Sequence, residues 1–367
     1  MPMEEKRESR SALRGAGGVM VKILAVILTT VLLITAGLCG VVWILSRGPS
    51  PTAQKLFVLS VRETSAVGFL ADMFLSEEEV AAIAAEAEDT GSDEQTDTSM
   101  IQVNKPSDSE TVENPENPDP EEEQPEHPEI PTSDLPEDTD GDGIEIVDVS
   151  GKGFRGKMMF VFDPTRVFVG TPPTLGGVGL TLMDMVETYE AVGGINGGGF
   201  YDPNGTGSGG IPDGILISNG ELLYGSAGVS YSTVGFDAEG VLHVGNMTPQ
   251  QAVDAGLQHA VSFGPALIIN GVIQDEGGAL VSGVNPRTAI GQRADGVALL
   301  LVIDGRQIGC LGATYEDLAQ VMLEFGAVNA SNLDGGSSTL MVYEGEIQNV
   351  CASVSGPRPI PTAFLVK

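Results

Sequence analysis

The feature that most constrains this chain is an uncharged apolar run over residues 23–45. At about 1.5 Å per residue, a helix of this length spans the roughly 30 Å hydrocarbon core of a bilayer. Basic residues precede the run at Lys6, Arg7, Arg10, Arg14 and Lys22, and Arg47 follows it. This bias predicts that residues 1–22 form a cytoplasmic tail, that residues 23–45 are a single-pass signal-anchor, and that the rest of the chain lies outside the cell.

Three other readings of the run are weaker. A cleaved signal peptide has a shorter apolar region and ends in a small-residue cleavage site, which this run lacks. A lipoprotein modified at Cys39 needs a small residue where Leu38 stands. A buried core helix is rarely uncharged over such a length. The sequence therefore predicts an uncleaved anchor in the cell membrane.

The acidity of the chain is concentrated in one segment. The whole chain has 18 Lys+Arg against 51 Asp+Glu, a net charge of −33, and residues 86–142 contribute 21 acidic residues and one basic residue. This segment contains no aromatic residue, so it cannot bury enough apolar surface to fold. We expect a helical stalk over 46–88, with a capping box at Ser76 and Glu79, and a disordered acidic linker over 89–150. Nucleic acid is not an expected partner, since its phosphates need a basic surface.

The linker ends in a sequence that resembles the start of a calcium loop. Asp138, Asp140, Asp142 and Gly143 match the opening positions of an EF-hand loop, but Val149 stands where a bidentate Glu is required. The sequence favours an ordinary acidic linker end, and leaves weak calcium binding at 138–149 open.

Residues 151–367 are apolar and glycine-rich, and predict one domain with its own core. Strand-like runs occur at 158–162, 166–170, 214–218, 266–270 and 297–304. Helices are predicted over 181–192, after Thr248 with Gln251 completing a capping box, and after Thr314 with Asp317 in the same role. Strands with a few segregated helices predict an α+β fold.

Four polar segments end apolar runs, where a scaffold presents functional loops. In 193–214, Asn196 and Asp202 stand among glycines that otherwise suggest tight turns. In 285–291, Arg287 is a candidate anion-binding fork or a structural cap on carbonyl groups. In 303–306, Asp304 and Arg306 suit either a site or a turn held by its own ion pair.

The fourth polar segment, 330–345, combines a carboxylate with backbone and hydroxyl donors. Asp334 is followed by Gly335 and Gly336, and then by the hydroxyl residues Ser337, Ser338 and Thr339. This set suits an oxyanion with one group for proton transfer, although a hairpin turning at the two glycines is an alternative. No His lies in the four segments, so neither a His-based triad nor a metal site is predicted. Cys310 and Cys351 are either one disulfide or two free thiols.

The ordered set of motifs resembles the phosphodiester glycosidase family. The resemblance covers residues 151–367 and is carried by NGGGFYD (196–202), NPRTAIG (285–291), IDGR (303–306), NLDGGSST (332–339) and RPIPTAFLV (358–366). Ser337 departs from the third glycine of many members. The resemblance implies an α+β hydrolase without a cofactor that cleaves a sugar-1-phosphodiester. Bacterial members are described as exopolysaccharide-biosynthesis-like, and many are membrane-anchored.

Roles for site residues follow from the resemblance. Asp304 and Asp334 are implied as the paired carboxylates of glycoside hydrolysis, in an order that the sequence does not assign. The implied substrate-binding residues are Asn196, Asp202, Arg287, Arg306, Gly335, Gly336, Ser338, Thr339 and Arg358. We expect an extracytoplasmic hydrolase acting on a cell-envelope glycan or glycolipid. The alternatives are a non-catalytic polysaccharide-binding module and a metal-dependent phosphodiesterase that cuts the P–O bond.

Overall fold

The computed structural model describes residues 2–62, 64, 67–85, 94–103, 136–205, 207–275 and 280–367. Side chains are described for these residues except for 2–19 and 204. Most of the predicted acidic linker, including residues 104–135, therefore lies outside the described residues.

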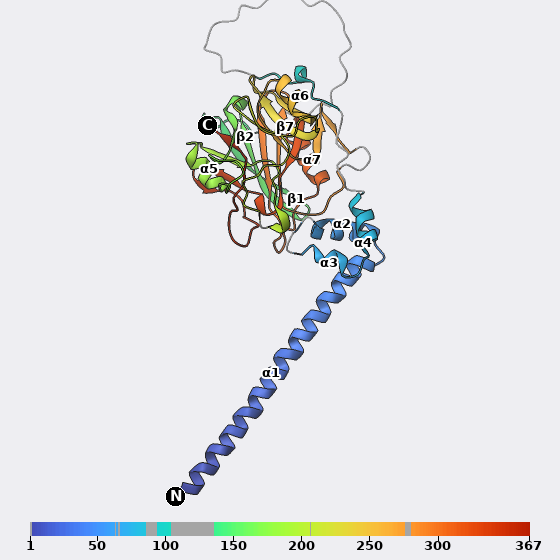
Figure 1. Cartoon of the computed structure of the whole chain (residues 1–367), viewed down its shortest axis with the longest axis vertical. Coiled ribbons are helices and arrows are strands. Elements are labelled where there is room, and N and C mark those ends of the chain that lie inside the picture. Colours follow the sequence, from blue (N-terminus) through green and yellow to red (C-terminus); the bar gives the residue numbers. More distant parts are fainter. Residues whose placement is uncertain are drawn as a thin grey trace, which may run out of the picture.

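Helix α1 (Pro2–Arg47) projects away from the rest of the molecule (Figure 1). Within its part from Met20 to Arg47, an 18-residue stretch has a mean hydropathy of 2.5 and is 0% buried against other parts of the protein. A core helix of a soluble domain is mostly buried, whereas this helix exposes its apolar side chains on every side. The helix is thus long and apolar enough to cross a membrane.

Three short helices follow α1 and form the stalk, as Figure 1 shows: α2 (Pro51–Arg62), α3 (Phe69–Asp72) and α4 (Glu77–Ala85). They share a small core of their own, made of Val58, Val61, Ala71, Leu75 and Val80. The capping box at the start of α4 is present, with the Glu79 N–H donating to Ser76 Oγ at 3.2 Å and the Ser76 N–H donating to Glu79 Oε2 at 2.8 Å.

The rest of the described chain is built on three antiparallel sheets, which confirms the α+β class. The seven-stranded sheet has the order β1 (Ile144–Gly151), β2 (Phe154–Val161), β13 (Ala298–Ile303), β12 (Arg287–Arg293), β14 (Ala327–Leu333), β10 (Ala266–Ile269), β11 (Val272–Ile273). One five-stranded sheet has the order β16 (Glu346–Ile347), β15 (Met341–Tyr343), β4 (Gly193–Asn196), β17 (Ala363–Val366), β3 (Val167–Gly170). The other has the order β6 (Glu221–Tyr224), β5 (Leu216–Ser218), β9 (Leu257–Ser262), β7 (Tyr231–Asp237), β8 (Leu242–Met247).

The core explains why β13 is apolar along its whole length. Successive residues point to opposite faces of a strand, so Leu300 packs with both five-stranded sheets, whereas Leu299 and Leu301 pack under helix α7 (Tyr315–Glu324). Both faces of the seven-stranded sheet are therefore buried. Helices α5 (Leu182–Thr188) and α6 (Pro249–Asp254) cover the outer faces of the two smaller sheets. The capping boxes predicted before α6 and α7 are both present.

The domain begins earlier than the sequence suggested. Strand β1 starts at Ile144, inside the segment assigned to the linker, and pairs with β2 along its full length. The sequence pattern there is acidic at Glu145 and Asp148, but Ile144 and Val149 are buried against the sheet core. The boundary at residue 151 was therefore placed too late.

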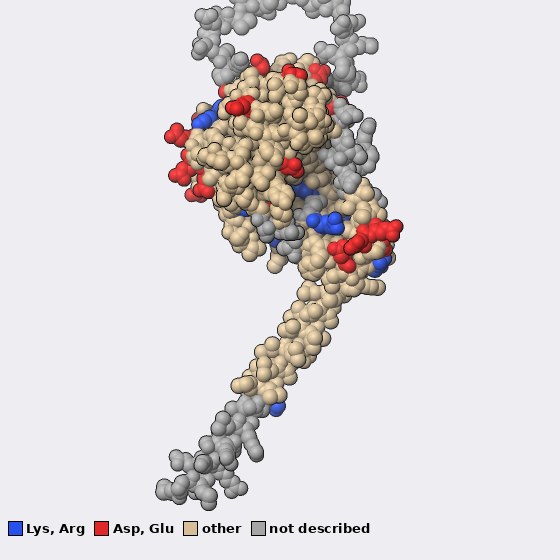
Figure 2. Space-filling view, in the orientation of Figure 1, with Lys and Arg blue, Asp and Glu red and all other residues tan. Residues whose placement is uncertain are grey.

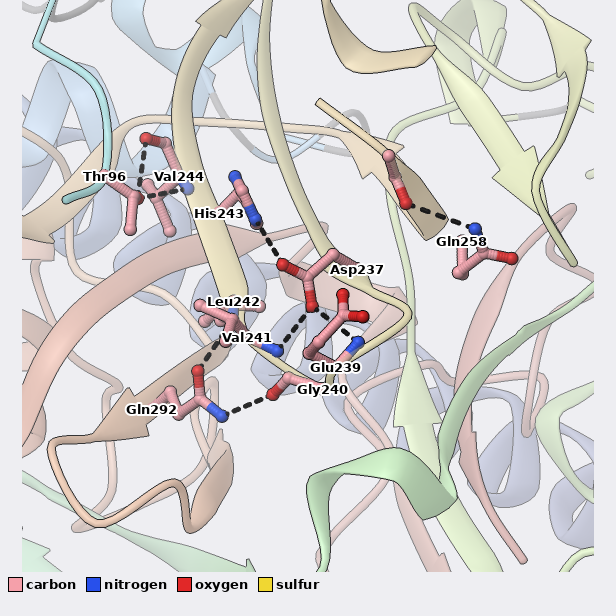
Figure 3. Close-up of polar contacts among 11 residues, drawn as sticks. Thr96, Asp237, Glu239, Gly240, Val241, Leu242, His243, Val244, Gln258 and Gln292 are labelled. Atoms are coloured by element: carbon pink, nitrogen blue, oxygen red, sulfur yellow. Dashed lines mark hydrogen bonds and ion pairs between the residues drawn. The ribbon is translucent and has the colours of Figure 1, made fainter. Parts of the chain in front are cut away.

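Residues 94–103 also pack on the domain, at the end away from α1 (Figure 1). Ile101 is buried with Val241 and Val328, and Thr96 exchanges hydrogen bonds with the backbone of Val244 (Figure 3). Nearby, Asp237 pairs with His243 Nε2 at 2.9 Å and accepts hydrogen bonds from the turn that joins β7 to β8. This polar network fixes the turn on which residues 94–103 rest.

Candidate active site

Strand order brings the predicted polar segments to one end of the seven-stranded sheet. Strand β12 lies between β13 and β14, with Arg287 opposite Ile303 and Thr288 opposite Leu333. Because these strands are antiparallel, the start of β12 meets the ends of both neighbours. The residues that follow Ile303 and Leu333 therefore emerge beside Arg287.

Two cavities meet at this end of the sheet. The smaller has a volume of about 350 Å³ and the larger about 690 Å³, and both are lined by Asp202, Phe263, Asp334 and Arg358. The larger cavity is also lined by Arg287, Arg306, Gly335 and Gly336. Lys and Arg atoms are visible in the hollow between the domain and the stalk (Figure 2). Two carboxylates and three arginines thus surround the junction of two connected spaces.

Asp334 is the most chemically distinctive residue at the junction. The residue is partly exposed, but its carboxyl oxygen Oδ2 is buried and has no hydrogen-bond partner among the described residues. Burial raises the pKa of Asp334 to about 6, and the Ser338 hydroxyl and the positive charge of Arg358 oppose this shift only in part. A carboxyl with such a pKa exchanges a proton near neutral pH, as general acid–base catalysis requires.

Arg306 is held over the glycine pair that follows Asp334. Its Nη1 donates to Ser337 Oγ at 3.3 Å and its Nη2 donates to Asn285 Oδ1 at 3.0 Å. A Cβ on Gly336, which has φ +60°, would lie 3.1 Å from Arg306 Nη2. Glycine is therefore favoured here by both the backbone conformation and the close approach of the guanidinium. The hairpin alternative is wrong, because the strands on either side of this loop, β14 and β15, belong to different sheets and do not pair.

Arg287 lines the larger cavity and also holds its wall. Its Nη2 donates to the Gly283 carbonyl at 2.6 Å, its Nε donates to the Ala313 carbonyl at 3.1 Å, and its guanidinium lies 4.2 Å from the centre of the Tyr315 ring. Both roles that the sequence left open for Arg287 are thus compatible with its position, because it caps carbonyl groups and faces the cavity.

Asp202 and Arg358 form an ion pair at the junction. Asp202 Oδ2 accepts from Arg358 Nη2 at 2.5 Å, and Asp202 Oδ1 accepts from the Gly207 N–H at 2.7 Å. Arg358 also lies over the Phe200 ring at 4.7 Å. These contacts join the loop after β4 to the segment before β17, although 156 residues separate the two partners.

Three predicted substrate-binding residues lie behind the cavity wall. Asn196 is buried and donates to the Asp334 carbonyl at 2.6 Å, while its Oδ1 accepts from Thr288 Oγ1 at 2.8 Å and from the Leu340 N–H at 3.1 Å. Ser338 and Thr339 are buried and line neither cavity. Asn196 therefore fixes the Asp334 loop from behind.

The structure does not bring Asp304 to the cavities beside Asp334. Its Oδ1 accepts from the Val350 N–H at 2.8 Å and from Asn349 Nδ2 at 3.3 Å, and its Oδ2 lies 3.6 Å from Arg155 Nε. Asp304 thus fastens the loop after β16. The second carboxylate at the junction is Asp202, whereas the resemblance implied Asp304 as the partner of Asp334.

Several residues that line the cavities were not identified by any sequence motif. Asp213, Tyr231 and Ser262 line the smaller cavity, and Thr64 of the stalk lines the larger one. Tyr231 and Ser262 come from β7 and β9, whose sequences read as ordinary mixed strands. Only the packing of one sheet against another places them beside Asp334.

One acidic group in the described part of the chain has the spacing of a metal site. The carboxylates of Asp138, Asp140 and Asp142 lie within 4.8 Å of one another and are exposed. They accept hydrogen bonds from the backbone of their own loop, which is what an acidic turn does without an ion. The three cysteines, Cys39, Cys310 and Cys351, are free thiols, which settles the alternative that the sequence left open.

Comparisons with known proteins agree with the resemblance seen in the motifs. Residues 189–367 match the family model for phosphodiester glycosidases. The chain is 31% identical over 197 residues to the SPbeta prophage-derived uncharacterized protein YomE of Bacillus subtilis (strain 168), in an alignment that covers 51% of this chain and 29% of that protein. It is 28% identical over 218 residues to mouse N-acetylglucosamine-1-phosphodiester alpha-N-acetylglucosaminidase, covering 54% of this chain and 41% of the mouse protein.

A solved structure supports the fold. The catalytic domain of zebrafish N-acetylglucosamine-1-phosphodiester alpha-N-acetylglucosaminidase, auto-inhibited by its pro-peptide, superposes with a TM-score of 0.52 at 23% identity. The match covers 61% of this chain and 81% of the zebrafish chain. This chain spans less than half the length of the curated relatives it matches. The predicted resemblance to the phosphodiester glycosidases is confirmed.

Proposed function

We propose that this chain, which carries the phosphodiester glycosidase match over residues 189–367, is a membrane-anchored hydrolase whose domain lies outside the cell and cleaves a sugar-1-phosphodiester at its glycosidic bond. The observation that carries the proposal is the junction of the two cavities, where the buried carboxyl oxygen of Asp334 lies among Arg287, Arg306 and Arg358. The similarity to enzymes named for this reaction supports it.

The two cavities suit the two halves of such a substrate. The smaller cavity offers aromatic faces at Phe200, Tyr231 and Phe263 with polar groups at Asp213 and Ser262, a combination that binds sugars. The larger cavity offers the guanidinium groups that bind a phosphodiester. The scissile bond then lies at the junction, beside Asp334.

Asp334 acts in this proposal as the general base. A water oxygen bonds to the anomeric carbon, the bond from that carbon to the phosphate oxygen breaks, and the phosphomonoester leaves with the electron pair. The Asp334 carboxylate takes the proton that the water loses. A phosphate leaving group needs little protonation, so the reaction requires a base more than an acid. The Asp202–Arg358 ion pair keeps a carboxylate and a cation fixed at the same junction.

The anchor belongs to the same proposal. Helix α1 is long and apolar enough to span a bilayer, and the basic residues before it favour a cytoplasmic N-terminus. The domain then faces the cell envelope, where glycans and glycolipids with sugar–phosphate bonds are the expected substrates.

Product analysis tests the reaction. The full-length protein in detergent is incubated with a panel of sugar-1-phosphodiesters, and we expect free sugar plus a phosphomonoester. Asp334→Asn should lower kcat by about 10²-fold or more, since it removes the base but keeps the shape. Asp254→Asn, on the exposed end of α6, is the matched control and should retain full activity.

Release of sugar phosphate, with loss of activity in EDTA, would instead identify a metal-dependent phosphodiesterase. Tight glycan binding without turnover would identify a binding module.

A further inference from the structure

We propose that the larger cavity opens toward the bilayer and takes a sugar-1-phosphodiester whose second ester carries a lipid chain, with the loop tips at Ile308 and Val354 entering the membrane surface. This inference rests on the proposed function, because it names the substrate class of the same site. In this proposal the exposed apolar side chains at the loop tips contact one partner, the lipid surface in which α1 is anchored.

The stalk is fastened to the end of the apolar helix. Arg47, the last residue of α1, donates from Nη1 and Nη2 to the two carboxylate oxygens of Glu79 at 2.6 and 2.9 Å, and from Nε to the Phe74 carbonyl at 2.8 Å. Gln54 Nε2 donates to the Ser46 carbonyl at 2.7 Å. The end of α1 thus contacts α2, α4 and the segment after α3, so these helices lie at the membrane surface when α1 spans it.

The same stalk reaches the larger cavity. Ser60 Oγ accepts from the Val284 N–H at 2.8 Å, and Thr64 Oγ1 accepts from Arg306 Nη2 at 2.9 Å. A Cβ on Gly283 would lie 2.3 Å from the Ser60 nitrogen, so the stalk and the loop before Arg287 are in direct backbone contact. Only the thickness of the stalk separates the phosphate-binding end of the cavity from the end of α1. Figure 1 shows the lower loops of the domain beside α2 and α3.

Apolar side chains are exposed around this end of the site. Ile308 and Val354 have fractional exposures of 106% and 107%, and Phe69 on α3 is 63% exposed. Ile308 is at the tip of a narrow turn closed by hydrogen bonds between Gln307 and Cys310, immediately after Arg306. Val354 lines the larger cavity itself. Large apolar residues at the tips of such loops are unfavourable in water and are typical of surfaces that contact lipid.

The position of these apolar tips indicates which class of substrate the larger cavity takes. With the sugar in the smaller cavity and the phosphate at the arginines, the group on the second ester leaves the larger cavity past Val354 and Thr64. That path leads to the apolar tips and the bilayer. A lipid chain on the second ester would continue into the membrane along this path.

Quenching of tryptophan fluorescence tests whether the loop tips at residues 308 and 354 enter the membrane, and this measurement does not depend on catalytic activity. The sequence has one Trp, Trp43. In a W43F background, I308W and V354W are placed singly in the full-length chain and reconstituted in vesicles containing brominated lipids. We expect at least a twofold loss of fluorescence at both positions relative to vesicles of ordinary lipid. V272W, on the exposed edge strand β11 beside residues 94–97, is the matched control and should not be quenched. Equal fluorescence of I308W in both vesicle types would overturn the proposal.

Turnover tests the substrate class in the same vesicles. A sugar-1-phosphodiester with a long lipid chain is compared with one carrying a short water-soluble alcohol. I308S should lower kcat/KM for the lipid-linked substrate about tenfold and leave that for the soluble one unchanged, and V272S should change neither. An equal effect of I308S on both substrates would contradict the inference while leaving the hydrolase intact. If the wild type releases sugar from neither substrate, the proposed function fails, and the quenching result still decides whether the loops enter the membrane.

Discussion

Asp334 combines two properties that rarely coexist in a structural carboxylate, namely a buried oxygen with no described hydrogen-bond partner and a raised pKa. Asp304, which follows strand β13 in a similar sequence context, accepts hydrogen bonds from Val350 and Asn349 and forms an ion pair with Arg155. From the sequence alone, the two residues are equally good candidates for a catalytic carboxylate, because both follow an apolar strand. The difference is set by which loops fold back on each of them.

If Asp334 is the base, as proposed, its pKa of about 6 predicts the direction of the activity profile. The carboxylate form of Asp334 becomes populated as pH rises through 6, so kcat/KM should rise about tenfold per pH unit below pH 6 and level off above it. Initial rates at fixed low substrate between pH 4 and 8 measure this. A profile that falls through pH 6 would show that Asp334 acts as an acid.

The same group predicts an opposite trend in stability. The folded pKa of Asp334, about 6, lies above the unfolded value near 4, so between these pH values the folded state holds more protons. The stabilisation from this proton is fully present below pH 4 and is lost as pH rises through 6, by roughly 2–3 kcal/mol. Asp334→Asn should remove this contribution. Urea unfolding of both proteins at pH 4.5 and 7 gives the comparison, and a parallel pH dependence in the variant would contradict it.

The loop formed by Gly335–Ser338 shows how an element prepares a binding site. Gly336→Ala places a Cβ at positive φ and 3.1 Å from Arg306 Nη2. We expect a loss of about 1–2 kcal/mol of stability and a raised KM with a smaller change in kcat, because the guanidinium that is proposed to bind the phosphate must move. Gly345→Ala is the control, since it has φ +76° but nothing within 4 Å, and should cost stability without raising KM.

Elements were predictable where local chemistry determines them. Helix α7 could be placed from Thr314, Asp317 and its apolar face, and β13 from its unbroken apolar run. Strands β7, β8 and β9 could not, because glycine and polar residues interrupt their patterns and pairing with one another stabilises them. The cavity residues Tyr231 and Ser262 were missed for the same reason, since they belong to these strands.

The whole domain depends on residues that the sequence assigned to a linker. Strand β1 supplies a full antiparallel partner for β2, and Ile144 and Val149 fill both faces of the seven-stranded sheet. A fragment of residues 151–367 should therefore be much less stable than one of residues 136–367, or should fail to fold. Thermal unfolding of the two purified fragments measures this. A fragment of residues 94–367 should be more stable still, because Ile101 packs on Val241 and Val328.

The position of β17 has a consequence for biosynthesis. Residues 363–366 lie between β3 and β4, so this strand joins two strands that are made much earlier in the chain. Until translation reaches Ala363, that sheet exists as two pieces with Val169 and Ile195 uncovered. Until β17 is made, this sheet stays incomplete and its apolar residues stay open to chaperones. A nonsense mutation a few codons before Ala363 should therefore give a degraded product rather than a folded domain.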